Sequence, residues 1–504
     1  MSHRCALVFA AALVALCSLV TLTPTHAEAF CGFYVGGAST KLYNNATEVV
    51  LLREGTKTVL SMQNNYEGPP EDFAMVVPVP VVLKEEEVKT LPSTIFEKID
   101  RLASPRLVQY WERDPCYKPP RKSKRPRSRS KRKGAVAMES SAAPEEEPLV
   151  KVEAEFDVGE YNVVILSAKE SNALESWLVS NKYNIPEGAA GVLKGYIEAG
   201  QYFFVAKVDI EKVKRDPRTK RVTLSPLRFH YDSETFALPV RLGLLNAKGA
   251  QDLIVHILGQ NQRYEVANRP NAFIPTNLIV RKKTVERFGE FYAALFDYTL
   301  KQNPGAVVKE YSWQAMKCDP CPDGSFGTGR GLGGALTRSD IATLGGDVVG
   351  MDDVRRSRGR GSSGTGWVLT RLHARYTAKE LKEDLVFKTA KPIVGGRGTP
   401  SGLRPKMDEE GPVPSSFNNF QGRYIMLQPW TGKLSCRKPE RGRWAGPPSG
   451  GRRKPVASAQ DTAFATRGRV QLHKTIRSKN VEGLPFTLTR EELERRKKLE
   501  ETAK

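Results

Sequence analysis

The sequence lacks the short motifs by which many enzyme classes are identified. It contains no G-x-S-x-G nucleophile turn, no H-E-x-x-H zinc helix and no Walker phosphate loop, so the enzyme classes that carry those motifs are not supported. After the first thirty residues, no apolar run approaches the roughly 18–20 residues that span a bilayer. We therefore expect no assembled active site and no transmembrane segment in the mature chain.

Cysteine is also scarce, with 7 among 504 residues. A zinc knuckle built on Cys318 and Cys321 would need a second ligand pair at matching spacing, and the sequence has none. We predict no metal-ligating, cofactor-binding or catalytic residue and no cofactor.

The N-terminus indicates export. Arg4 gives a positive start, residues 6–22 are almost wholly apolar, and Ala27 and Ala29 form a small-x-small cleavage site. These features predict a signal peptide that is cleaved near Ala29. An uncleaved signal anchor is the alternative. We expect a periplasmic, cell-envelope or extracellular protein.

Export determines how the remaining cysteines are interpreted. In an oxidising compartment five cysteines form at most two disulfides and leave one thiol. The Cys318-Asp319-Pro320-Cys321 spacing also permits a thiol redox motif, but a loop follows it, whereas that motif works at a helix start. We favour a structural role for Cys318 and Cys321 over a redox role. The disulfide candidates are Cys31, Cys116, Cys318, Cys321 and Cys436.

Positive charge is concentrated in one stretch. The chain has 78 basic and 56 acidic residues, and residues 118–133 alone hold ten basic residues and no acidic one. Such a run binds polyanions through counterion release, although a solvated loop explains it equally well. It has no interleaved aromatic residues for base stacking, so we predict no nucleic-acid partner.

Hydrophobic patterns predict an α+β fold with mixed, largely antiparallel sheets, a few packed helices, disulfide staples and a disordered basic loop and tail. Residues 150–158 alternate apolar and polar side chains, and residues 236–240 and 253–258 are apolar strands. Ser93 is a predicted N-cap of a helix that ends at Ser104, and a longer helix is expected over residues 283–301.

At this length, two or three packed units with linkers are expected. The expected segments are a signal peptide (1–29), an N-terminal β-rich unit (30–116), a disordered linker (117–149), a central α+β unit (150–316), a Cys/Gly-rich loop region (317–366), a C-terminal β segment that packs on the core (367–436) and a basic tail with a terminal helix (437–504).

Several apparent motifs fail on context. Residues 329–334 match the dinucleotide pattern G-x-G-x-x-G with Asp352 downstream, but no strand precedes them. Glu71 and Asp72 are interpreted as solvated turn residues rather than an acid/base pair. The mature histidines have no carboxylate or second histidine at ligand spacing and are interpreted as hydrogen-bonded structural residues. They are His230, His256, His373 and His473.

Several segments resemble one family, the secreted bacterial domain of unknown function 2330, over about residues 30–436. The resemblance implies an exported bacterial envelope protein and family positions for all five mature cysteines, and it implies no activity. The similar segments are FCGFYVGG (30–37), FAMVVPVPVVL (73–83), YWERDPC (110–116), VGEYNVVILSA (158–168), residues 236–280, CDPCP (318–322), VLTRLHARY (368–376) and QPWTGKLSC (428–436).

Two hypotheses follow. The preferred one is a non-enzymatic envelope protein, a scaffold that binds an anionic envelope component or another envelope protein and uses its basic loop and tail for attraction. The alternative is an exported enzyme, for example a thiol-dependent one that uses Cys318 and Cys321.

Overall fold

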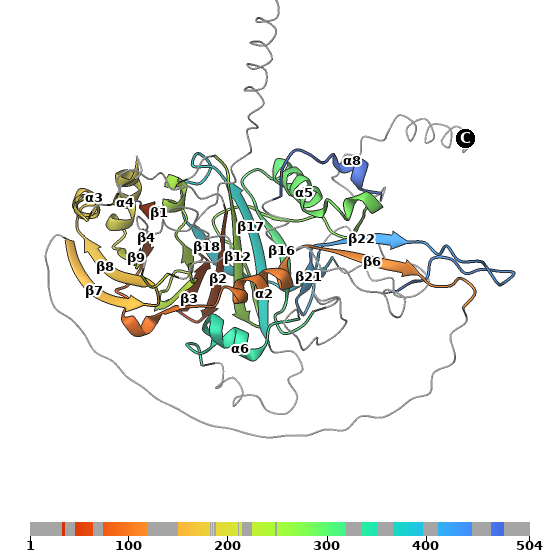
Figure 1. Ribbon diagram of the computed structural model, residues 1–504, viewed down its shortest axis with the longest axis horizontal. Helices are drawn as coiled ribbons and strands as arrows, with labels where there is room; N and C mark the ends of the chain where they lie inside the picture. The colour runs from red at the N-terminus through yellow and green to blue at the C-terminus, as the bar shows by residue number, and fades with distance from the viewer. Residues whose placement is uncertain are drawn as a thin grey trace, which may run out of the picture.

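A computed structural model describes residues 33–35, 46–63, 74–117, 150–181, 183, 185, 188–209, 211–213, 224–246, 249–318, 334–350, 366–396, 412–445 and 465–477. These residues form a mixed α+β structure with mostly antiparallel sheets, which confirms the predicted fold class (Figure 1). None of the helices within these ranges combines the length and apolarity that crossing a bilayer requires.

A large central sheet organises the fold. Its middle strands are antiparallel except for β2 and β12, which pair in parallel. In spatial order the strands are β20 (Val413–Pro414), β19 (Ile393–Gly395), β21 (Asn419–Gln421), β16 (Val307–Gln314), β17 (Trp367–Tyr376), β12 (Gln251–Gln260), β2 (Ala46–Glu54), β3 (Lys57–Gln63), β10 (Leu227–Asp232) and β5 (Val88–Thr90), with β14 (Asn271–Phe273) beside β16.

A second sheet lies at one end of the molecule, on the left in Figure 1, with two helices against one face. Its order is β1 (Phe33–Val35), β4 (Ala74–Val79), β9 (Tyr202–Val208), β8 (Tyr161–Ala168) and β7 (Val150–Val158), and the helices are α3 (Ser171–Ser180) and α4 (Ala189–Glu198).

Because proline cannot donate to a strand ladder, Pro78 is expected to end its strand, and this expectation is wrong. Strand β4 continues through Pro78 to Val79 and pairs with β9 over its whole length. Among the described residues, strand β1 pairs only with Ala74 to Val76, so Pro78 lies beyond the part of β4 that the described part of β1 covers.

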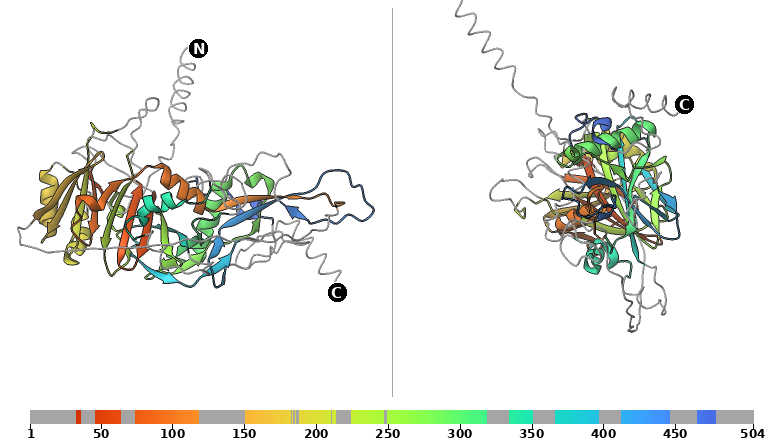
Figure 2. Two further views of the ribbon diagram at one scale, coloured as in Figure 1. Left: turned by 90° about the horizontal axis from the view of Figure 1, so that it is seen from below. Right: turned by 90° about the vertical axis from the view of Figure 1, so that its right-hand side faces the viewer.

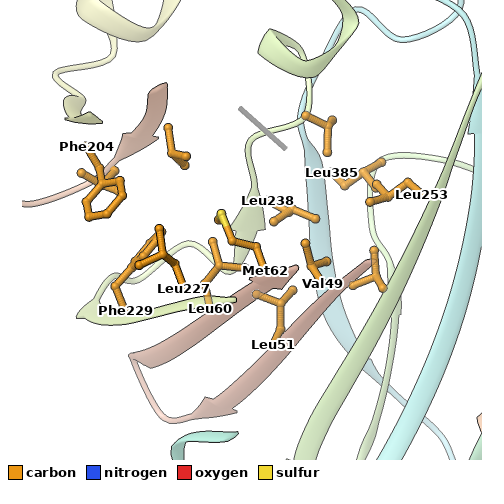
Figure 3. Packing of buried hydrophobic residues seen from close by; sticks show 14 of the residues in the cluster. Val49, Leu51, Leu60, Met62, Phe204, Leu227, Phe229, Leu238, Leu253 and Leu385 are labelled. Atoms are coloured by element: carbon orange, nitrogen blue, oxygen red, sulfur yellow. The ribbon is translucent and has the colours of Figure 1, made fainter. Parts of the chain in front are cut away.

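The main hydrophobic core fills the space between these sheets and a small third sheet. Alternate side chains of β2 and β3, such as Val49, Leu51 and Met62, point into it (Figure 3). Phe204 from β9 and Leu385 reach the same core. The third sheet consists of β11 (Ala237–Leu238), β18 (Leu385–Ala390) and β13 (Arg263–Val266).

The opposite face of the central sheet is covered by helices and by two further apolar clusters. The predicted helix after Ser93 forms and ends at Ser104, although the Ser93 side chain makes no capping hydrogen bond. The helix expected from residue 283 starts later. The helical elements on this face are α2 (Thr94–Ala103), α5 (Phe288–Gln302), α6 (Arg338–Ile341), α8 (Leu472–Thr475), η4 (Lys282–Thr284) and η5 (Ala342–Gly346). Elsewhere, η3 (Leu242–Asn246) lies beside β1 and α4, and η2 (Glu85–Glu87) lies beside β7 and β10.

A fourth sheet projects from the body as an arm, at the right of Figure 1 and again in the left view of Figure 2. A disulfide between Cys116 and Cys436, whose Cα atoms are 5.4 Å apart, closes its outer part. We call this sheet, together with residues 113–117 after β6 and residues 429–443 after β22, the arm. Its strands are β15 (Leu278–Ile279), β22 (Arg423–Gln428), β6 (Arg106–Glu112) and β23 (Trp444–Ala445).

Candidate functional site

A basic pocket of about 290 Å³ lies where the segment 465–477 meets the chain before α5. Four of its residues are exposed and cationic, and no acidic residue lines it. We call it the basic pocket. It is lined by Lys283, Thr284, Arg287, Gly468, Arg469, Val470, Gln471, Lys474 and Thr475.

Backbone pairing fixes the two walls of the basic pocket against each other. The N–H of Arg281 donates to the carbonyl of Thr475 at 2.7 Å, and the N–H of Arg477 donates to the carbonyl of Ile279 at 2.6 Å. The Thr284 hydroxyl also donates to the Thr475 carbonyl. Ile476 packs in the same apolar cluster as α5, which holds the segment 465–477 against that helix.

The positive charges of the basic pocket are only partly balanced by carboxylates. Arg287 forms an ion pair with Glu290 on the first turn of α5 and donates to the carbonyl of Arg469 at 3.3 Å. Lys283, Arg469 and Lys474 have no carboxylate among the lining residues, although Arg469 also interacts electrostatically with Glu290 outside the lining. Three cations around one hollow attract an anionic group.

A second group of charged residues lies inside the protein, on the face of the central sheet that α2 covers. Because side chains alternate along a strand, Glu48 shares a face with Val50 and Leu52, and His256 with Leu258. Glu310 occupies a β-bulge in β16, between Lys309 and Tyr311. We call this group the buried ionic cluster: Glu48, Asp100, Asp252, His256, Glu310, Arg371 and His373.

Arg371 is the centre of this cluster and is fully buried. Its guanidinium bonds Asp100 at 2.5 Å and Glu310 at 2.6 Å. Burial alone would lower the pKa of Arg371, but these two carboxylates raise it. The arginine therefore stays charged and compensates two buried carboxylates.

His373 connects the buried ionic cluster to residues nearer the protein surface. Its Nδ1 lies 2.8 Å from Glu310 and its Nε2 3.0 Å from Asp252, while its ring stacks on Phe296. Burial would lower the pKa of His373, but the two carboxylates outweigh burial and raise it. Asp252 also binds Arg467 at 2.9 Å, so the network reaches the segment that walls the basic pocket.

Glu48, Asp100 and His256 offer ligand atoms within 4.8 Å of one another. They do not fit a divalent cation. Arg371 lies 3.2 Å from Nε2 of His256 and already neutralises Asp100, so a metal would be placed beside a fixed positive charge. A metal on Nδ1 would also require an N–H at Nε2, facing the arginine donor.

The pKa shifts of Glu48 and His256 instead favour the uncharged form of both side chains. Burial, followed by the charge of Asp100, raises the pKa of Glu48 well above its ordinary value. Burial, followed by the charge of Arg371, lowers the pKa of His256 well below its ordinary value. Both shifts favour the uncharged forms, a protonated carboxyl at Glu48 and a neutral imidazole at His256, whose Nδ1 lies 3.3 Å from Glu48.

The expectation that the histidines are isolated from carboxylates is wrong for His256 and His373. Strands distant in sequence bring Glu48, Asp252 and Glu310 to their rings, which spacing along the chain could not show. The hydrogen-bonded role expected of His373 is confirmed. His230 lies on β10 and His473 on α8, apart from the cluster.

The described residues also include three of the candidate cysteines. Cys116 and Cys436 form the disulfide of the arm. Cys318 is 3% exposed and also disulfide-bonded. Cys31, Cys321, the cleavage position Ala29, residues 71–72 and residues 329–333 lie outside the described residues.

The raised pKa of His373 leads to a prediction for stability against pH. A raised folded-state pKa stabilises the protein fully below the unfolded-state value of about 6.5, and this contribution is lost as pH rises through the folded-state pKa. In urea unfolding, the free energy of unfolding of wild type should exceed that of His373→Gln most below about pH 6.5. The difference between the two proteins should shrink toward alkaline pH. His473→Gln is the control. A difference that stays constant across the range would contradict the prediction.

The comparisons with known proteins identify a family. Neither the curated proteins nor the solved structures contain a match to this chain. One family model matches residues 25–388, which includes the buried ionic cluster but ends before residues 429–443 of the arm and the segment 465–477. The chain therefore belongs to the family described as uncharacterized protein conserved in bacteria, DUF2330.

Proposed function

We propose that this protein is an exported, non-enzymatic envelope protein that binds an anionic group of an envelope component in the basic pocket. The observation that carries the proposal is the convergence of Lys283, Arg469 and Lys474 on one hollow with no acidic lining residue. Phosphate and carboxylate groups are the anions that such charge-assisted hydrogen bonds bind best.

Two features support export. The first thirty residues have the pattern of a cleaved signal peptide. The Cys116–Cys436 disulfide joins residues 320 positions apart, and such bonds persist in oxidising compartments.

The lining of the basic pocket favours binding over catalysis. It offers lysine, arginine, threonine and glutamine side chains but no carboxylate and no histidine, the side chain that most often acts as general base. The alternative, a thiol-dependent enzyme that uses Cys318 and Cys321, requires a sulfur atom that a substrate can reach, and Cys318 is buried. Disulfide mapping by mass spectrometry of the purified protein tests this alternative.

The binding proposal predicts that the double variant Lys283→Gln/Lys474→Gln loses affinity for inorganic pyrophosphate by about tenfold or more. The reason is that hydrogen bonds to charged groups contribute roughly 1.5–3 kcal/mol each. Isothermal titration calorimetry measures the effect.

The matched control is Lys301→Gln/Lys379→Gln, which removes the same charge from exposed lysines elsewhere and should bind as wild type does. Equal weakening in both double variants would show that net charge, rather than the pocket, attracts the anion. Unchanged binding in both would exclude the pocket as the site.

A further inference from the structure

The outer end of the arm is firmly built although its apolar core is small. That core consists of Val108, Tyr110 and Ile425, with Leu427 and Trp444 against it. Besides the Cys116–Cys436 disulfide, a buried carboxylate holds the loop that joins β22 to β23.

This carboxylate is Glu112, which is 7% exposed. It accepts hydrogen bonds from the N–H of Trp430 at 2.9 Å, the N–H of Gly442 at 2.8 Å and the Arg441 guanidinium at 2.9 Å. Both ends of the loop are thereby fixed to β6. The surface that the loop presents is pre-organised, which reduces the entropy cost of binding.

We call residues 113–117 and 429–443 the arm tip. Its exposed side chains combine positive charge with apolar groups: Lys433, Arg437 and Lys438 are exposed, and Leu434 and Tyr117 are 45% and 48% exposed. The tip contains six basic residues, Arg113, Lys433, Arg437, Lys438, Arg441 and Arg443, against two acidic ones, Asp114 and Glu440.

Further basic residues follow the arm tip directly in the sequence. Tyr117 is followed directly by the run 118–133 with its ten basic residues, so that run is tethered to the arm tip. Both ends of the loop 429–443 are also anchored there by Glu112.

We propose that the arm tip docks on the surface of an anionic phospholipid bilayer. Basic clusters are attracted to anionic headgroups by about 1 kcal/mol per residue near the surface, and tyrosine is enriched at the membrane interface. Stable attachment requires two signals, and the tip has both charge and the apolar side chains of Leu434 and Tyr117. A soluble polyanion would not need the apolar groups.

The experiment is co-sedimentation of the mature full-length protein with phosphatidylglycerol/phosphatidylcholine vesicles and with phosphatidylcholine vesicles alone. Binding to the anionic vesicles alone is expected. The variant Lys433→Gln/Arg437→Gln/Lys438→Gln should weaken it by about tenfold to hundredfold. The variant Leu434→Ser/Tyr117→Ser should also weaken it, and its residual binding should be more salt-sensitive.

Matched controls use surfaces away from the arm. Lys194→Gln/Lys207→Gln/Lys382→Gln removes the same charge, and Val152→Ser/Val179→Ser removes exposed apolar groups of 47% and 57% exposure. Both should bind as wild type does. The arm-tip variants should bind inorganic pyrophosphate as wild type does, which separates this inference from the pocket proposal.

Three outcomes would overturn the inference. Unchanged vesicle binding in both arm-tip variants would exclude the tip. Loss of binding only on deletion of residues 118–133 would assign the attraction to that run alone. Tight binding of soluble polyphosphate, with no effect of Leu434→Ser/Tyr117→Ser on either ligand, would identify an anionic polymer as the occupant instead.

Discussion

Replacing Arg371 with methionine is expected to lower the free energy of unfolding by about 3–5 kcal/mol, because two buried carboxylates lose their counter-charge. Asp100 and Glu310 lie 2.5 Å and 2.6 Å from the guanidinium, and Arg371 is fully buried, so water cannot replace it. Equilibrium unfolding in urea measures the loss. If the variant does not accumulate in folded form, its soluble yield shows the same effect.

Removing the two carboxylates that lose their counter-charge should restore part of the lost stability. The triple variant Arg371→Met/Asp100→Asn/Glu310→Gln is expected to be more stable than Arg371→Met alone. Arg375→Met is the control, since Arg375 pairs with Asp252 but is 24% exposed at its side chain, and its effect should be much smaller. A loss below about 1 kcal/mol for Arg371→Met would show that the ion pairs contribute little net stability.

The second large effect is expected on removal of the arm disulfide. The double variant Cys116→Ser/Cys436→Ser should lose about 2–5 kcal/mol of stability, because the bond closes a very long loop and restricts the unfolded chain. The separation of the two cysteines is 320 residues. Thermal unfolding without reductant measures the change.

Limited proteolysis gives a second readout, in which cleavage within residues 429–443 should be faster in the double variant than in wild type. Cys318→Ser, at the other described disulfide-bonded cysteine, is the control and should leave that cleavage unchanged. Equal melting temperatures and equal cleavage rates in wild type and double variant would contradict the prediction.

The sequence predicted individual elements better than their assembly. A local apolar run identified β12, and local alternation identified β7, because each side-chain pattern is a property of one strand. It placed Val152 on the inner face of β7, yet this residue is 47% exposed. A bulge between Val152 and Ala154 shifts the register there, and alternation alone does not reveal a bulge.

The candidate site was harder to predict. The buried ionic cluster joins strands far apart in sequence, so spacing rules had no access to it. One signal was present: Arg371, His373 and Arg375 occupy alternate positions of an otherwise apolar strand, which puts three basic groups on one face. The basic pocket gave no such signal, because its walls at residues 283–287 and 468–475 are each ordinary polar surface. The division of the chain into separate units stays a prediction.

The strand order also constrains when the protein can fold. At the middle of the central sheet, Ile254 has Glu48 on one side and His373 on the other, so three strands from widely separated parts of the chain must meet. A nascent polypeptide cannot complete this sheet until β17 has been synthesised. Such high contact order slows folding and leaves β2 and β3 with an unpaired edge meanwhile, a state in which a chaperone would protect the chain from aggregation.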